Sequence, residues 1–264
     1  MKNVFEHHGV EYLSPSSINK FRDDPAKWLV NIAGYRDKAY SPAMTFGNIV
    51  ELGITHACMR PDSDIEEAIQ LCMDRYALTH KEIMDDKVDY DFDKCFEKQV
   101  LLPNTLKKVI PLYRQIEGFK EAQVKVEYKF DELPIPIRGY VDMMYESQVR
   151  DIKTTGRQPK NNGNYNRQLG FYCLATKKKP ILDYIYVTKY KQEFMTVEVQ
   201  NIENHIADLK RIALKMMRIL SFSSDINEVA HMSCLEPDTS NENFMRQWGL
   251  KKLKVLMSYL RSKK

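Results

Sequence analysis

The chain has 264 residues, of which 43% are hydrophobic and 29% are charged, and its formal net charge is +4. This much apolar surface supports a packed core and excludes wholesale disorder. The mildly basic balance is compatible with a nucleic-acid partner without establishing one. No stretch approaches the roughly 18 consecutive apolar residues of a membrane-spanning helix, and the N-terminus has no apolar signal segment. We therefore expect a soluble cytoplasmic protein.

The five cysteines are dispersed, and none belongs to a C-x-x-C pair. An odd number at such spacing favours reduced thiols over a disulfide framework or a zinc knuckle. The positions are Cys58, Cys72, Cys95, Cys173 and Cys234.

The first 120 residues predict mainly helices, with Ser14 or Ser16 as the cap of the first one. The acidic stretch at residues 85–94 is interpreted as a connection between two of them. The predicted helices cover residues 13–35, 41–59, 64–84 and 103–117.

Beyond residue 120 apolar and polar residues alternate, which is typical of half-buried strands. Three segments joined in sequence, with a turn at residues 146–148, predict an antiparallel meander. These strands cover residues 122–133, 135–145 and 149–155. A helix at 164–179, strands at 182–190 and 193–202, and helices at 203–222 and 241–261 are predicted to follow.

The predicted fold class is a single α/β domain over residues 1–264. Its parts are a mainly helical segment at 1–120, a sheet with one helix at 121–200, and C-terminal helices at 201–264.

Three charged residues, Asp142, Asp151 and Lys153, occupy positions that otherwise look like strand interior. Residues i and i+2 of a strand share a face, so Asp151 and Lys153 point the same way while Ile152 points into a core. A turn of two or four residues would place Asp142 opposite Asp151, whereas an odd-length loop would place it opposite Ile152. The sequence leaves this register open.

Two neighbouring carboxylates repel each other unless a cation neutralises them. Mg²⁺ or Mn²⁺ suits such oxygen ligands and leaves coordination positions for water and a substrate phosphate. Lys153 would then lie beside the attacking water and stabilise charge on the scissile phosphate. The set fits phosphodiester hydrolysis, although D-x-K is a common sequence that, taken alone, is better explained by a surface salt bridge across a hairpin.

Three segments in this order, G-x-x-D at 139–142, D-x-K-T at 151–154 and Q-x-x-x-Y at 168–172, resemble the motifs of the PD-(D/E)XK nuclease superfamily. More narrowly, they resemble the RecB-like branch, which includes viral alkaline exonucleases and CRISPR-associated nucleases. Upstream, "SPSSINKFRDDP" at 14–25 resembles the N-terminal segment of that branch, and "FGNIVE" at 46–51 resembles its G-x-x-x-H element.

The resemblance implies a restriction-endonuclease-like core, with a central mixed sheet flanked by helices and a helical N-terminal elaboration. It implies catalytic roles for Asp142, Asp151, Lys153, Gln168 and Tyr172. It implies metal ligation by Glu51, Asp142, Asp151 and the carbonyl of Ile152, and DNA contacts by Thr154, Gln168 and Tyr172. Glu127 would support the metal site indirectly.

Some of these roles have simpler alternatives. Gln168 and Tyr172 also fit burial between a helix and the sheet, and Glu127 also fits a surface charge. Ser16, Ser17 and Arg22 could bind a terminal phosphate at a helix N-terminus, or the two serines could simply cap that helix.

The chain departs from the family pattern at three positions. Val141 replaces the proline that names the superfamily. Glu51 replaces the histidine usual in the branch, with His56 as the alternative counterpart. Asp24 replaces a cysteine that holds an iron–sulfur cluster in some members, and Cys234 is the only late cysteine, so no such cluster is expected.

The resemblance implies a Mg²⁺-dependent deoxyribonuclease, and more narrowly an exonuclease that resects DNA ends in viral recombination, replication or repair. The implied partners are DNA ends, in duplex or single-stranded form, and a single-strand annealing or single-strand-binding protein. A structure-specific or restriction-like endonuclease and a non-catalytic DNA-binding module remain as alternatives on the same fold.

Overall fold

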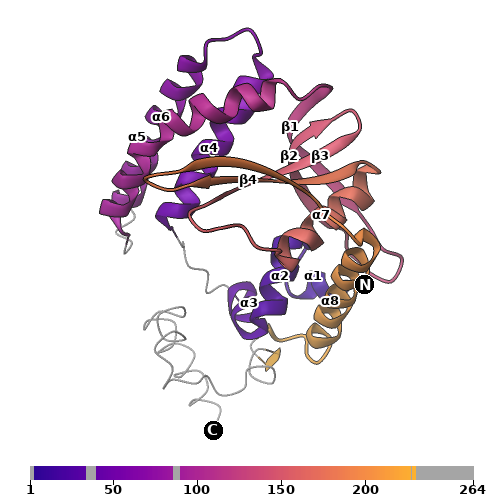
Figure 1. The fold of residues 1–264 in the computed structure, drawn as a ribbon. Coiled ribbons are helices and arrows are strands. Elements are labelled where there is room, and N and C mark those ends of the chain that lie inside the picture. Colours follow the sequence, from indigo (N-terminus) through magenta and orange to yellow (C-terminus); the bar gives the residue numbers. More distant parts are fainter. Residues whose placement is uncertain (1–2, 34–39, 86–89, 227, 230–264) are drawn as a thin grey trace. The chain divides into compact units, whose positions relative to one another are not determined.

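The computed structural model describes residues 3–33, 40–85, 90–226 and 228–229 (Figure 1). The chain divides into two compact units. One comprises Met1–Asp37, Tyr128–Arg138 and Ala207–Lys264, and the other comprises Lys38–Glu127 and Gly139–Ile206. We call them the N/C unit and the sheet unit.

The described strands form one mixed sheet in the order β1-β2-β3-β4-β5. The second and third strands are antiparallel, β3 and β4 are parallel, and β4 and β5 are antiparallel. Helix α7 (Gly163–Thr176) supplies the crossover that a parallel pair needs. The strands are β1 (Phe119–Tyr128), β2 (Ile137–Tyr145), β3 (Gln148–Thr155), β4 (Lys179–Val187) and β5 (Gln192–Glu198). The predicted α/β fold with a mixed sheet flanked by helices is confirmed.

The two faces of the sheet carry different helices (Figure 1). On one face, side chains of β2, β3 and β4, including Met143, Ile152 and Ile185, join a core with three helices. These helices are α4 (Pro42–Met59), α5 (Ile65–Asp85) and α6 (Phe92–Arg114). Helix α7 packs on β3 and β4 and reaches Asp151, which points away from that core. Asp151 and Lys153, which share a face of β3, thus lie on the α7 side.

The N-terminal helical segment is two helices, α2 (Pro15–Asp23) and α3 (Pro25–Ile32), so the prediction of one continuous helix was wrong. The break falls at Asp24, which has extended φ and caps α3 by accepting the N–H of Lys27 at 2.9 Å. Pro25 has no N–H to continue the first helix and fits the first position of the second. A short helix, α1 (Val4–His7), precedes both.

Helix α6 begins at Phe92, eleven residues before the predicted start. Asp91 caps it by accepting the N–H of Lys94 at 3.0 Å. Pro103 and Pro111 lie inside the helix, where proline ordinarily indicates a boundary. Burial of an apolar face that includes Leu102 and Leu106 outweighs that local preference.

Helix α8 (Ile202–Leu220) confirms the helix predicted at 203–222. Its buried residues recur at helical spacing: Leu209, Ile212, Ala213, Met216 and Leu220. The helix predicted at 241–261 lies outside the described residues. None of the described helices is both long enough and apolar enough to cross a membrane.

Candidate active site

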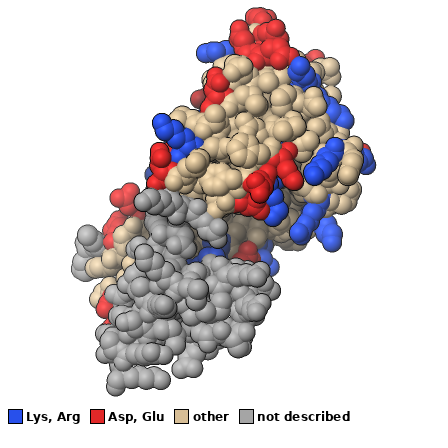
Figure 2. Space-filling view, turned by 90° about the vertical axis from the view of Figure 1, so that its left-hand side faces the viewer, with Lys and Arg blue, Asp and Glu red and all other residues tan. Residues whose placement is uncertain are grey.

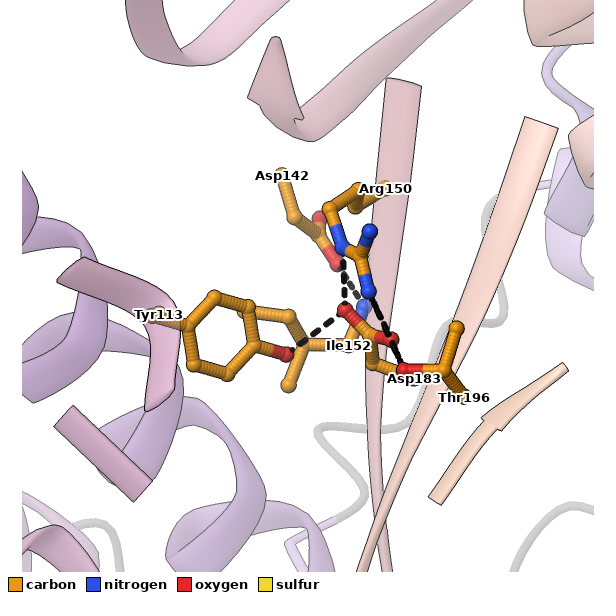
Figure 3. Close-up of polar contacts among 6 residues, drawn as sticks. All are labelled: Tyr113, Asp142, Arg150, Ile152, Asp183 and Thr196. Atoms are coloured by element: carbon orange, nitrogen blue, oxygen red, sulfur yellow. Dashed lines mark hydrogen bonds and ion pairs between the residues drawn. The ribbon is translucent and has the colours of Figure 1, made fainter. Parts of the chain in front are cut away.

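The β2–β3 hairpin places the two aspartates next to each other. Met143 pairs with Arg150 and Met144 with Val149, which leaves a two-residue turn of Glu146 and Ser147. One further step in the same register sets Asp142 opposite Asp151, and opposite residues of an antiparallel pair share a face. The carboxylate of Asp142 also crosses to β3 and accepts the backbone N–H of Ile152 at 2.7 Å (Figure 3).

Asp151 lies at the centre of the polar contacts on β3. Its side chain is fully buried, and its Oδ2 is 2.5 Å from Nζ of Lys153. The side-chain amide of Gln168 donates to Oδ1 at 3.0 Å. The Lys153 ammonium also lies 5.4 Å from the ring centroid of Tyr165 on α7, within the range of a cation–π interaction.

Helix α7 joins the last motif to the first through Tyr172. The Tyr172 hydroxyl accepts from Gln168 at 2.8 Å and donates to the carbonyl of Tyr140 on β2 at 2.5 Å. A Cβ on Gly139 would lie 2.7 Å from Cε1 of Tyr172 and 3.1 Å from Cε1 of Phe171. Glycine at this position therefore allows α7 to pack closely against β2, and it links the G-x-x-D and Q-x-x-x-Y segments physically.

Helix α4 contributes Glu51 through a similar close approach. A Cβ on Gly47 would lie 2.7 Å from Oγ1 of Thr154, so glycine allows α4 to lie against the end of β3. Glu51 follows one helical turn later, on the same side of the helix. Its Oε1 accepts a short hydrogen bond from Nε2 of Gln123, a β1 residue whose φ of 55° is left-handed.

Electrostatic coupling shows that these acids and the lysine share one environment. Burial raises the pKa of Glu51 to about 7, with Lys153 lowering it and Asp151 raising it further. Burial and then the charge of Asp151 raise the pKa of Asp142 well above its usual value. Burial would lower the pKa of Lys153, but Asp151 and Asp142 outweigh it, so the pKa is raised and the lysine is charged. Such clustered shifts are typical of functional sites.

The alternative counterpart of Glu51, His56, lies elsewhere on α4. Its Nε2 is 3.4 Å from the guanidinium of Arg60, and it does not contribute to the pKa shifts of Asp142, Lys153 or Glu51. The geometry therefore favours Glu51.

The donor set suits a hard divalent cation because it consists of carboxylate oxygens. In Glu51 and Asp142, burial and the charge of Asp151 raise the pKa, and a bound cation would offset both effects. Within the described ranges, the present side-chain positions bring no three Asp, Glu, His or Cys residues close enough together to hold a metal ion. Each carboxylate instead bonds a nearby donor. Asp142 accepts from the Ile152 N–H, Asp151 contacts Lys153 and Gln168, and Glu51 accepts from Gln123. Mg²⁺ commonly uses only one or two protein carboxylates, so the set fits, and the individual ligands stay a prediction.

A second polar network, which sequence reasoning missed, holds the other face of β3 (Figure 3). Arg150 donates two hydrogen bonds of 2.7 Å to Asp183 on β4, the strand residue that pairs with Ile152. Tyr113 of α6 and Thr196 of β5 each donate to Asp183 at 2.9 Å. This network joins β3 to β4, β5 and α6 near Ile152, on the face of the sheet opposite to Asp142 and Asp151.

The predicted phosphate-binding residues Ser16, Ser17 and Arg22 belong to the N/C unit. Ser14 caps α2 by accepting the N–H of Ser17 at 3.1 Å, so the cap is neither Ser16 nor Ser17. The Ser17 hydroxyl accepts the indole N–H of Trp28 at 2.8 Å. Arg22 forms an exposed ion pair of 3.2 Å with Asp23.

Both serines line a cavity of about 280 Å³ in the N/C unit, and Arg22 does not. The full lining is Ser14, Ser16, Ser17, Lys20, Trp28, Asn31 and Ile32. Phosphate binding by Ser16 and Ser17 stays a prediction.

Three further predicted residues are placed as follows. Glu127 is exposed on β1, and Gln123 of the same strand bonds Glu51. Thr154 is half-buried at the end of β3, and the Ile152 carbonyl lies 3.4 Å from the Lys153 ammonium. Sequence reasoning missed Gln123, for which there was no signal. It also missed Tyr165, whose spacing of three from Gln168 places it on the same helix face.

A model of the PD-(D/E)XK nuclease superfamily matches residues 12–234. The chain therefore belongs to the PD-(D/E)XK nuclease superfamily. Membership indicates nuclease activity on a nucleic acid, and these nucleases generally use a divalent metal ion.

Other comparisons add little to this assignment. Among solved structures, the chain matches the crystal structure of SSO0001 at 13% sequence identity and a TM-score of 0.33, over 88% of this chain and 96% of that one. No curated protein sequence matches.

Proposed function

We propose that this nuclease is a Mg²⁺- or Mn²⁺-dependent DNA exonuclease of the RecB-like branch, which resects DNA ends for viral recombination, replication or repair. The observation that carries the proposal is the convergence of the family motifs. Asp142 bonds the backbone between Asp151 and Lys153, and Gln168 bonds Asp151. The branch assignment rests on Glu51 and the N-terminal segment at 14–25.

The chain's own residues divide the work of hydrolysis. Asp142, Asp151, Glu51 and the Ile152 carbonyl would hold the metal ion, which supplies Lewis-acid activation of a phosphoryl oxygen and of water. Lys153, charged, half-buried and paired with Asp151, would stabilise the developing negative charge on the scissile phosphate. Gln168 orients the Asp151 carboxylate, and Tyr172 fixes Gln168.

The surface of the protein is compatible with a nucleic-acid substrate but does not by itself identify one. On the face shown in Figure 2, lysine and arginine side chains are interspersed with aspartate and glutamate and do not gather into one basic area. DNA recognition would then depend on contacts close to the site, including Thr154, Gln168 and Tyr172, and on Ser16 and Ser17. A single-strand annealing or single-strand-binding protein is the proposed partner in the same pathway.

The test is digestion of end-labelled linear duplex and covalently closed circular DNA with Mg²⁺. An exonuclease shortens the linear molecule progressively and leaves the circle intact. Rapid nicking or linearisation of the circle would assign the endonuclease activity instead. If the protein binds DNA in Ca²⁺ but cuts no DNA or RNA with any divalent ion, it is a non-catalytic binding module.

A further inference from the structure

A second cavity lies in the sheet unit, at the end of β3 beyond Lys153. Its volume is about 350 Å³. It is formed by the start of α4, by α6, by the end of β4 and by the turn after β3. Its lining residues are Ala43, Phe46, Lys98, Thr154, Thr155, Gly156, Arg157 and Val187. None of the roles argued above requires this cavity as such.

The charged residues of the lining are both cations, Lys98 and Arg157, and no acidic side chain lines the cavity. Two other lysines of α6 pair with carboxylates: Lys94 with Asp91 at 2.6 Å and Lys107 with Glu66 at 2.7 Å. In the described ranges no carboxylate lies within ion-pair distance of Lys98 or Arg157. Lys98 instead lies 5.2 Å from the ring centroid of Phe46.

The rest of the lining consists of a hydrogen-bonded polar turn and several apolar side chains. The Thr155 hydroxyl accepts the backbone N–H of Arg157 at 3.1 Å and donates to its carbonyl at 2.9 Å. These two bonds fix the turn that carries Arg157. Phe46, Ala43 and Val187 supply the apolar part. A cationic edge over an apolar floor suits a group that combines an anion with a flat or apolar body, as a nucleotide does.

The cavity and the proposed cleavage site share strand β3. Thr154 directly follows Lys153, and Asp151 stands three residues before it on the same strand. Because an extended strand rises by about 3.3 Å per residue, Asp151 and Thr154 are separated by roughly 10 Å. The Thr154 side chain faces α4, opposite to Asp151 and Lys153. A nucleic-acid strand whose scissile phosphate lies at those two residues would therefore pass the end of β3 to reach the cavity.

We propose that this cavity binds a nucleotide of the substrate strand adjacent to the scissile bond, with Lys98 and Arg157 contacting its phosphate. The proposal rests on the proposed function, because it assigns the cavity to the same substrate. It names two binding residues, Lys98 on α6 and Arg157 after β3, that belong to none of the motifs.

The first experiment measures binding of a fluorescent DNA oligonucleotide in Ca²⁺, by anisotropy, over a series of salt concentrations. Lys98→Ala/Arg157→Ala is expected to weaken binding about tenfold or more and to reduce the slope of log K against log[salt] by about 1 to 2, since two phosphate contacts are lost. Lys98→Arg/Arg157→Lys should retain most of the affinity. The control is Lys120→Ala, since Lys120 pairs with Glu146 at the turn where β3 begins.

The second experiment locates the contacted phosphate. Oligonucleotides that carry a single neutral methylphosphonate at successive positions are titrated against the wild type and the double variant. One position near the cleaved bond should weaken wild-type binding and have little effect on the double variant. Equal sensitivity of both proteins at every position, or an unchanged salt slope, would overturn the proposal.

The two proposals fail separately. If the wild type cuts DNA and the double variant binds as the wild type does, the cavity assignment is wrong and the nuclease assignment stands. If no substrate is cut but binding depends on Lys98 and Arg157, the nuclease assignment is wrong, and the cavity is a nucleic-acid contact without a scissile bond beside it. Thermal melting of each variant confirms that it is folded before binding is compared.

Discussion

The side-chain amide of Gln168 donates a 3.0 Å hydrogen bond to Oδ1 of the fully buried Asp151. Gln168 lies on α7 and Asp151 on β3, on the face of the sheet that α7 covers. Oδ2 of the same carboxylate lies beside Lys153. The orientation of Asp151 is thus set by one neutral and one charged donor.

Replacing Gln168 by alanine should therefore reduce cleavage without abolishing it. Loss of a residue that orients a metal-binding group typically costs about 10- to 100-fold in activity or metal affinity. Single-turnover digestion over a Mn²⁺ series measures both effects. Asn166→Ala is the matched control on α7 and should cut at the wild-type rate, because the Asn166 side chain bonds Asn161.

Lys153→Ala removes the cation beside the scissile phosphate and leaves Glu51, Asp142 and Asp151 in place. Cleavage should fall by at least about 10²- to 10³-fold, the usual cost of one lost electrostatic stabiliser. DNA binding in Ca²⁺ should persist, and excess Mn²⁺ should not restore cleavage. A variant that cuts at the wild-type rate would show that Lys153 has no role in the chemistry.

Asp142→Asn and Asp151→Asn should abolish cleavage by a different route, through weaker metal binding. Excess Mn²⁺ should then restore part of the activity, in contrast to Lys153→Ala. The comparison is made by digestion with increasing Mn²⁺, together with calorimetric titration of the metal into each protein. Identical metal affinity in the wild type and both variants would remove these aspartates from the ligand set.

The raised pKa of Glu51, about 7, predicts a pH dependence of activity. A metal-binding carboxylate must be ionised, so cleavage at limiting Mg²⁺ should rise as pH increases through about 7. The Glu51→Gln variant should bind metal more weakly, and its activity should no longer rise as pH increases through about 7. An unchanged pH profile in Glu51→Gln, at undiminished activity, would exclude Glu51 from the site.

The same shift predicts the sign of a stability effect. The pKa of Glu51 is higher in the folded than in the unfolded chain, so the protonated form favours folding. Its contribution is complete below about pH 4.5 and is lost as pH rises through about 7. Without added metal, Glu51→Gln should melt several degrees above the wild type at pH 8 and at the same temperature at pH 4. Equal melting temperatures at pH 8 would contradict this cause.

Asp183→Ala should destabilise the fold strongly, because it leaves Arg150 charged and buried without its partner. Breaking one side of a buried ion pair commonly costs about 3–5 kcal/mol. Urea unfolding measures the loss, and Arg150→Met/Asp183→Leu should recover much of it by removing both charges. The control is Glu198→Ala, whose exposed pair with Lys179 should contribute less than about 1 kcal/mol.

The sequence by itself determined the local features of the site. Strand alternation placed Asp151 and Lys153 on one face with Ile152 opposite, and helical spacing placed Gln168 and Tyr172 together, because both periods are properties of the backbone. The order of the motifs identified the superfamily. The register of Asp142 needed only the length of the turn, which the structure shows to be two residues.

Only the tertiary structure decided the contacts between distant segments. Gln123 bonds Glu51 across 72 residues, and Arg150 meets Asp183 because β3 and β4 lie parallel in one register. Helix α6 continues past Pro103 because its apolar face is buried, although proline locally favours a helix boundary. Lys98 and Arg157 share a cavity because α6 and the turn after β3 both border it. Such partners depend on how whole elements pack, and packing energy is shared among many residues, so no short sequence pattern records it.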